Sequence, residues 1–147
     1  LGGDALLTVL EAIEHDEPYA PEAQDNELAT YAAKLTKEEG LINWSLSALQ
    51  ISRAIRAFNP WPVCYTSAQG QTIRIWQGHR VNEQQTTAPA GMIIKADKQG
   101  LWVAAGDGGV IAIDTLQLPN GKALAFNDVL NSRKELFQVG TSLGNLA

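Results

Sequence analysis

Two prolines, Pro60 and Pro62, constrain the fold of this chain more than any other feature. They follow directly on an apolar helical pattern that ends at Phe58. Proline disfavours helical dihedral angles in the residue before it, so Asn59 and Trp61 are expected to be extended. The residues after the second proline are typical of a β-strand. The sequence therefore predicts a helix that ends at the mouth of a small β-structure, with Trp61 packed as a wedge between the two.

Hydrophobic periodicity predicts the elements around this junction. The helix before it should span residues 46–58 with Ser45 as its N-cap. A second, short helix is expected at residues 126–132, where Ala125 stands at the position of the cap. The candidate strands are rich in β-branched and aromatic residues, and the first two are joined by a polar turn. They cover residues 63–66, 72–76, 91–95, 101–105 and 110–118.

This pattern of elements favours one fold class. Five or six short strands, braced by a helix before them and a short helix at the C-terminal end, are typical of a mainly β protein, here a small oligonucleotide-binding-like β-barrel of Greek-key topology. A flat antiparallel sheet with a helix on one face is the alternative. The glycine-rich stretch 106–109 lies between two candidate strands and lacks the Lys-Ser/Thr and following helix of a phosphate-binding loop. It is therefore predicted to be a tight turn.

Charge is distributed unevenly along the chain. Residues 1–33 contain eight acidic side chains and no Lys or Arg, whereas residues 34–147 contain eleven Lys and Arg against eight Asp and Glu. The second part therefore carries a net charge of +3, although the whole chain carries −5. This asymmetry indicates an anionic partner on the basic side. No apolar run approaches the length of a membrane span and no export signal is visible, so we expect a cytoplasmic protein without membrane contact.

The sequence contains no pattern of catalytic or metal-binding residues. There is no Gly-x-Ser-x-Gly and no dinucleotide-binding glycine pattern, and His15 and His79 stand outside any metal-ligand spacing. The single cysteine, Cys64, lies between apolar residues and is predicted to be a core side chain rather than a reactive thiol. We therefore expect no catalytic residue, no metal site and no cofactor in this chain.

The region around the two prolines resembles a known family when its neighbours are considered. The segments that carry the resemblance are Thr30 to Glu39, Ile42 to Ser45 and Ile55 to Pro62. They resemble the linker and C-terminal domain of bacterial methionyl-tRNA formyltransferase. The likeness extends in the family's order to residues 2–7, 88–91, 106–108 and 130–133.

The resemblance implies a division of the chain into three parts. Residues 1–17 would be the terminal helix of a catalytic domain whose remainder is missing, which fits an amphipathic helix over residues 4–14 that has no apolar partner of its own. Residues 18–37 would be a linker, as their proline and acidic content also indicates. Residues 38–147 would be the C-terminal barrel domain.

The resemblance also implies a function. Enzymes of this family transfer a formyl group from 10-formyltetrahydrofolate to the amino group of the methionine carried by initiator tRNA, and their catalytic residues and folate pocket belong to the N-terminal domain. The present chain would then be inactive alone, and its partners would be initiator methionyl-tRNA and the missing catalytic domain. Its role would be to position the tRNA, because orientation alone contributes several kcal/mol to many enzymatic reactions.

Five cations are candidates for contacts with tRNA phosphates. The first two lie in the Lys-Leu-Thr-Lys run of the family's linker, and the others are chosen because they fall on predicted strands and turns of the more basic part. They are Lys34, Lys37, Arg74, Lys95 and Lys98. For the two linker lysines, the alternative is a solvated loop in which they pair with Glu38 and Glu39. The four tryptophans are expected to pack inside the domain rather than stack on bases.

Three other functions are compatible with the sequence. C-terminal domains of this kind also occur in sugar-nucleotide formyltransferases and in formyltetrahydrofolate dehydrogenases. A stand-alone nucleic-acid-binding module is a further alternative, although the apolar stripe of residues 4–14 argues against it. The acidic linker could also serve a protein-interaction domain.

Overall fold

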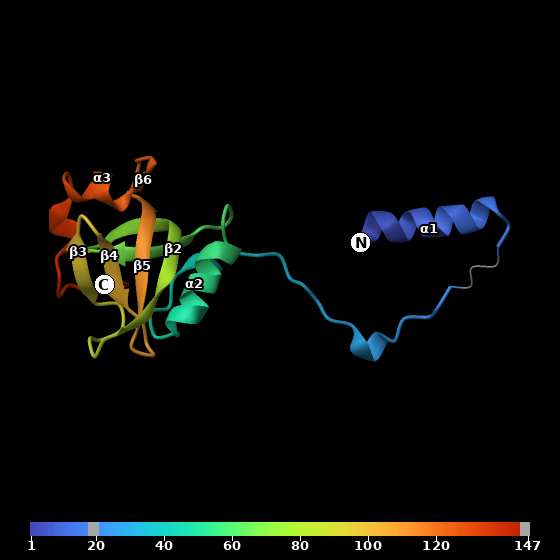
Figure 1. Cartoon of the computed structure of the whole chain (residues 1–147), viewed down its shortest axis with the longest axis horizontal. Coiled ribbons are helices and arrows are strands. Elements are labelled where there is room, and N and C mark those ends of the chain that lie inside the picture. The colour runs from blue at the N-terminus through green and yellow to red at the C-terminus, as the bar shows by residue number, and fades with distance from the viewer. Residues whose placement is uncertain (18–20, 145–147) are drawn as a thin grey trace. The chain divides into compact units, whose positions relative to one another are not determined.

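The computed structural model describes residues 1–17 and 21–144. The chain divides into two compact units, Leu1–Ala33 and Lys34–Ala147 (Figure 1). The first unit contains helix α1 (Gly2–Glu14) and the 3-10 helix η1 (Asn26–Leu28). The predicted first helix is thus confirmed, and its apolar stripe is exposed at Leu6, Leu7, Leu10 and Ile13. Residues 18–20 of the predicted linker lie outside the described residues, and the division at 17 and 37 stays a prediction.

The second unit is built on one antiparallel sheet, which confirms the predicted mainly β class. The strands follow the order β1-β2-β5-β4-β3, and β6 pairs with β5. Their bounds are β1 (Cys64–Ala68), β2 (Gln71–Gln85), β3 (Ile93–Asp97), β4 (Gly100–Ala104), β5 (Gly109–Gln117) and β6 (Ala123–Ala125). All five predicted strands are present, with ends shifted by one or two residues except in β2.

The sheet is open, because the edge strands β1 and β3 form no ladder with each other in the described part of the chain. The C-terminal segment instead bonds to both edges. The N–H of Gly144 donates to the carbonyl of Ser67 in β1, at 2.9 Å, and the N–H of Ile93 in β3 donates to the carbonyl of Thr141, at 2.8 Å. This segment covers part of the gap, so the sheet is a partly closed barrel.

Two strands differ from the prediction. Strand β2 continues to Gln85, nine residues past the predicted end at Trp76, and β6 was not predicted. Residues 77–85 are mostly polar and lack the alternation of a half-buried strand, so the predicted strand ended too early. Strand β2 is held over this stretch by its ladder with β5, which the pattern of β2 alone does not reveal.

Two helices brace the sheet, and one predicted cap is wrong. Helix α2 (Ala48–Ala57) packs against β2 and β5, and it is capped by Ser47 rather than Ser45. Ser47 is the cap because Gln50 stands three residues later, and the two form a reciprocal capping box. Helix α3 (Phe126–Leu130) begins after Ala125 without a side-chain cap, as predicted. Short 3-10 helices, η2 (Glu38–Gly40) and η3 (Lys134–Phe137), complete the unit.

The predicted wedge at the helix–sheet junction is also wrong. Trp61 is 53% exposed, whereas Val63 and Cys64 near it are buried. The N–H of Val63 donates to the carbonyl of Phe58 at 2.9 Å, and this bond closes a short loop that turns Trp61 outward. The buried tryptophan is Trp44, which is 5% exposed.

Candidate functional site

A surface groove of about 400 Å³ opens beside the loop between α2 and β1. The loop forms one side, and the beginnings of β1 and β2 form the other. Most of the lining side chains are aromatic, apolar or cationic, and none is a carboxylate. The lining residues are Lys37, Pro60, Trp61, Pro62, Val63, Tyr65, Thr72, Arg74 and Trp76.

The loop that carries Trp61 is held at both ends. Besides the bond that closes the loop at Val63, the side-chain amide of Asn59 donates to the carbonyl of Trp76 in β2 at 2.8 Å. Val63 has a φ of 69°, which a β-branched residue rarely adopts. Such a conformation persists only where the surrounding structure enforces it. The loop is therefore a defined structure that presents an aromatic ring to solvent.

Two of the five predicted cations, Lys37 and Arg74, line this groove. Both side chains are exposed, and neither forms an ion pair within 4.0 Å among the described residues. The alternative pairing of the linker lysines with their acidic neighbours is not observed in this part of the chain. The carboxylate of Glu39 instead accepts a hydrogen bond from the N–H of Thr36 at 2.7 Å. The two groove cations are thus available to an anion.

The other predicted cations lie elsewhere. Lys95 in β3 stands 4.3 Å from the centre of the Trp102 ring and 4.0 Å from the carboxylate of Asp97, so its ammonium group is engaged within the β3–β4 hairpin. Lys98 is exposed in the turn of that hairpin, and Lys34 is exposed at the start of the second unit. The structure therefore brings together only two of the five. Whether any of them contacts RNA stays a prediction.

The aromatic part of the groove was not predicted from the sequence. Tyr65 and Trp76 are half-buried, and the indole N–H of Trp76 donates to the side-chain carbonyl of Gln117 at 2.9 Å. A second hollow adjoins the groove, because Thr72 and Arg74 line both. The sequence did contain one signal, the position of Trp61 between two prolines. A rigid loop with an exposed ring fits this pattern as well as a packed ring does.

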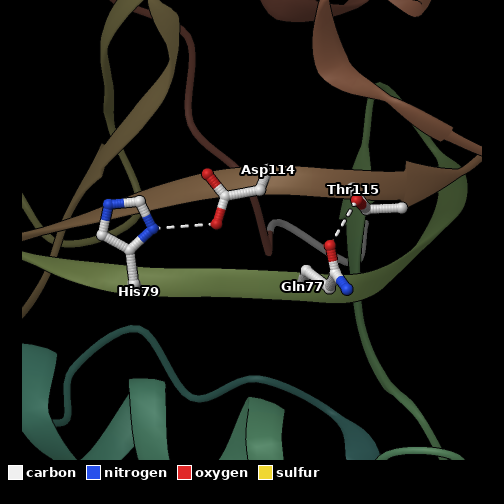
Figure 2. Close-up of polar contacts among 4 residues, drawn as sticks. All are labelled: Gln77, His79, Asp114 and Thr115. Atoms are coloured by element: carbon white, nitrogen blue, oxygen red, sulfur yellow. Dashed lines mark hydrogen bonds and ion pairs between the residues drawn. The ribbon is translucent and has the colours of Figure 1, made fainter.

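Exposed polar contacts between β2 and β5 mark the neighbouring surface (Figure 2). His79 bonds to the carboxylate of Asp114 at 2.8 Å, and the hydroxyl of Thr115 donates to the side-chain carbonyl of Gln77 at 2.9 Å. The hydroxyl of Thr115 bonds to an amide and the imidazole of His79 to a carboxylate, so neither contact pairs a hydroxyl or thiol with a base. They tie the two strands together across their ladder.

Burial raises the pKa of the Cys64 thiol to about 11. The thiol is therefore protonated at neutral pH, and the predicted core role is confirmed. No group of three or more His, Cys, Asp or Glu side chains is placed to hold a metal ion in residues 1–17 and 21–144. Within the same residues, no helix has the length and apolar character needed to cross a membrane.

Comparison with known families matches residues 34–134 to the C-terminal domain of formyl transferases. The chain belongs to this family. The matched residues include the whole groove and the sheet beneath it. The family prediction is thereby confirmed for the formyltransferase C-terminal domain, whereas the assignment to the methionyl-tRNA enzyme needs separate support.

Solved structures show the same fold. This formyl transferase C-terminal domain is similar to HypX from Aquifex aeolicus in complex with tetrahydrofolic acid, with a TM-score of 0.61 and 16% identity over 88% of this chain and 22% of the HypX chain. A multiply substituted variant of HypX gives a TM-score of 0.62 and 15% identity over 92% and 24% of the two chains. The chain spans less than a quarter of the HypX length. At this identity the likeness extends to the fold alone.

Proposed function

We propose that this chain is the tRNA-positioning C-terminal part of a methionyl-tRNA formyltransferase. In this proposal residues 1–17 are the end of its catalytic domain, residues 18–37 are the linker, and the folate co-substrate binds outside this chain. The observation that carries the proposal is the groove itself. Lys37 and Arg74 come from different segments and line one concave surface, and no carboxylate lines that surface in the part of the chain that the structure describes. Cations arranged in this way are suited to a phosphate backbone.

The balance of charge supports the same partner. The second part of the chain has a net charge of +3, which is small for an obligate nucleic-acid-binding protein. A domain of this kind is suited to orienting a tRNA that the catalytic domain also holds. By itself it should bind weakly and with little sequence preference, with a Kd of roughly 10⁻⁴ to 10⁻⁶ M at physiological salt.

A second candidate is the C-terminal domain of another formyltransferase of the family, which the likeness in fold to HypX favours. Such an enzyme acts on a substrate other than tRNA, so its C-terminal domain has no need to bind RNA. The resemblance of residues 34–39 and 55–62 to the tRNA enzyme favours the first candidate. Binding of tRNA therefore separates the two.

The experiment is a titration of the full chain with initiator methionyl-tRNA at two salt concentrations. The double variant Lys37→Ala/Arg74→Ala is compared with Lys122→Ala/Lys134→Ala, which removes two exposed lysines outside the groove. The groove variant should bind more weakly, and its slope of log K against log salt should fall by about one for each phosphate that is no longer neutralised. Equal slopes for the two double variants, or no binding by the wild type, would contradict the proposal.

A further inference from the structure

We infer that the groove holds an unpaired nucleotide of the bound RNA, with its base stacked on Trp61 and its phosphate between Lys37 and Arg74. This inference rests on the proposed function, because the RNA is taken to be the tRNA. It goes further in assigning the site to single-stranded RNA and in giving the main role to an aromatic side chain. Phosphate contacts alone would give no role to the exposed ring of Trp61.

The local structure of the loop keeps Trp61 exposed. An indole ring that is free to pack would lower its free energy by covering its apolar surface. Here the ring is 53% exposed. The loop around it is closed by the Val63–Phe58 bond and anchored to β2 by Asn59, and this keeps the ring at the surface. Prolines on both sides further restrict the backbone. A loop whose backbone is fixed before binding loses little conformational entropy when a ligand stacks on the ring that it carries.

The groove combines aromatic rings with cations, as nucleotide-binding surfaces do. Aromatic rings offer flat surfaces to any base, and they work together with cations that follow the sugar–phosphate chain. Trp61, Tyr65 and Trp76 provide the rings, whereas Lys37 and Arg74 provide the cations. The absence of a carboxylate among the lining residues leaves nothing there to repel a phosphate. A planar ring that carries an anionic group is therefore the ligand that this groove fits.

Stacking on Trp61 favours an unpaired nucleotide over a duplex. The faces of paired bases are covered by their neighbours in the stack, so a ring can stack only on a base that is unpaired or terminal. The groove is a hollow of about 400 Å³, within the range of roughly 300 to 1,000 Å³ that is typical of small-ligand sites. It shares Thr72 and Arg74 with the second hollow, where Asn120 provides an uncharged polar group for the next nucleotide.

The test uses the full chain with three RNA probes: initiator tRNA, a short single-stranded oligoadenylate and a long RNA duplex, in which the two terminal base pairs are a small fraction of the binding positions. Trp61→Leu keeps an apolar side chain but removes the ring, whereas Trp61→Phe keeps a smaller ring. Tyr31→Ala is the matched control, because Tyr31 is an exposed aromatic residue outside the groove. Melting temperatures are recorded for every variant, and binding is compared only between folded proteins.

We expect Trp61→Leu to weaken binding of oligoadenylate and tRNA by about 5- to 150-fold, the range typical of a lost base stack. Trp61→Phe should recover most of this loss. Duplex binding and the Tyr31→Ala variant should stay at wild-type levels. Equal loss of duplex binding in Trp61→Leu, or equal loss in the Leu and Phe variants, would overturn the stacking role.

Two further outcomes separate the inference from the proposed function. If the wild type binds tRNA and Trp61→Leu binds it equally well, the stacking inference is wrong and the proposed function stands. If the wild type binds no tRNA, the proposed function fails and the inference fails with it. A folate that displaces oligoadenylate from the wild type at lower concentration than a nucleoside monophosphate would also overturn the inference, since it would assign the groove to a different planar anion.

Discussion

The carboxylate of Asp107 accepts a hydrogen bond, at 3.1 Å, from the backbone N–H of Ala48, the first residue of α2. The same oxygen accepts one from the N–H of Gly109 at 3.0 Å. The first N–H groups of a helix have no partner within the helix, so the turn between β4 and β5 supplies one of them. These bonds, that of Ala48 first, hold the pKa of Asp107 below its ordinary value. The glycine-rich turn therefore anchors α2, the helix before the loop that lines the groove.

Substitutions of Asp107 should show that its carboxylate stabilises the fold and that this stabilisation depends on pH. Asp107→Ala removes the acceptor and should lower the free energy of unfolding by about 0.5 to 2 kcal/mol, as loss of a helix cap does. Asp107→Asn keeps an acceptor oxygen and should lose less. Because the folded pKa is depressed, the contribution of the charge is present above the ordinary Asp pKa of 3.8 and is lost as pH falls through the folded pKa.

The measurement is urea unfolding of the two variants and the wild type between neutral and acidic pH. The advantage of the wild type over Asp107→Asn should be constant at neutral pH and should shrink below about pH 4. A difference that grows on acidification would show that the carboxylate is strained rather than stabilised by Ala48.

Gly106 allows the same turn to approach the chain before α2. Its N–H donates to the carbonyl of Leu46 at 2.9 Å, and a Cβ at this position would lie 1.9 Å from the carbonyl oxygen of Ser45. Gly106→Ala must therefore push the turn and the start of the helix apart. We expect a loss of about 1 to 3 kcal/mol in the free energy of unfolding, as overpacking typically costs.

Gly121→Ala is the control for this substitution, since a Cβ there would meet its nearest neighbour, the carbonyl oxygen of Leu118, at 3.3 Å. It should change stability by much less in the same denaturant titration. Equal losses in the two variants would show that the close approach at Gly106 is not what requires glycine.

Trp44, rather than Trp61, should be the tryptophan on which stability depends. Its indole N–H donates to the hydroxyl of Thr66 at 3.0 Å in the buried core. Trp44→Phe removes the donor and leaves a gap, so we expect a loss of about 1 to 3 kcal/mol. Trp61→Phe should change the free energy of unfolding by less than about 0.5 kcal/mol, as exposed substitutions usually do. Thermal or urea unfolding of the two variants shows which substitution lowers the free energy of unfolding more. A larger loss for Trp61→Phe would contradict the exposed position of Trp61.

Local patterns were sufficient to predict most of the fold. The strand pattern at residues 110–118 predicted β5, and Ala125, expected at the cap position of the last helix, is the N-cap of α3 without a side-chain bond. The long β2 could not be recognised in this way, since residues 77–85 are extended because they pair with β5. To predict the cap of α2, one has to choose between Ser45 and Ser47. Gln50, three residues after Ser47, is the residue that identifies Ser47 as the cap.

The groove could be predicted only in part, for a related reason. Lys37 and Arg74 were selected by charge and position, and the fold brings them to one surface. The sequence does not tell which face of the chain a loop residue takes, so Trp61 was assigned to the core. Its exposure follows from a local hydrogen bond between Val63 and Phe58, which closes the loop and which hydrophobic periodicity does not predict. Lys95 was equally cationic, but its partners Trp102 and Asp97 are fixed by the β3–β4 pairing.

Cys64 should be unreactive while the domain is folded. Its side chain is 2% exposed and burial raises its pKa to about 11, so both access and the thiolate fraction are low at pH 8. A thiol reagent should modify it only at the rate of unfolding in native buffer and rapidly in denaturant. Because the folded pKa is raised, this group's contribution to stability is present below its ordinary value of 9.0 and is lost as pH rises toward 11. Fast modification of the native protein would contradict its place in the core.

Lys34 and Lys37 provide the test of the proposed function in a complete enzyme, where a catalytic domain precedes this chain. If they neutralise tRNA phosphates, replacing both with alanine should lower kcat/KM for methionyl-tRNA and flatten its dependence on salt, because fewer counterions are released on binding. The KM for the folate co-substrate should hardly change. Lys122→Ala/Lys134→Ala removes the same charge elsewhere and serves as the control. Solvated lysines without an RNA partner would change either substrate by no more than about 0.5 kcal/mol. Steady-state kinetics at two salt concentrations distinguish these outcomes, and an unchanged salt slope would remove both lysines from the site.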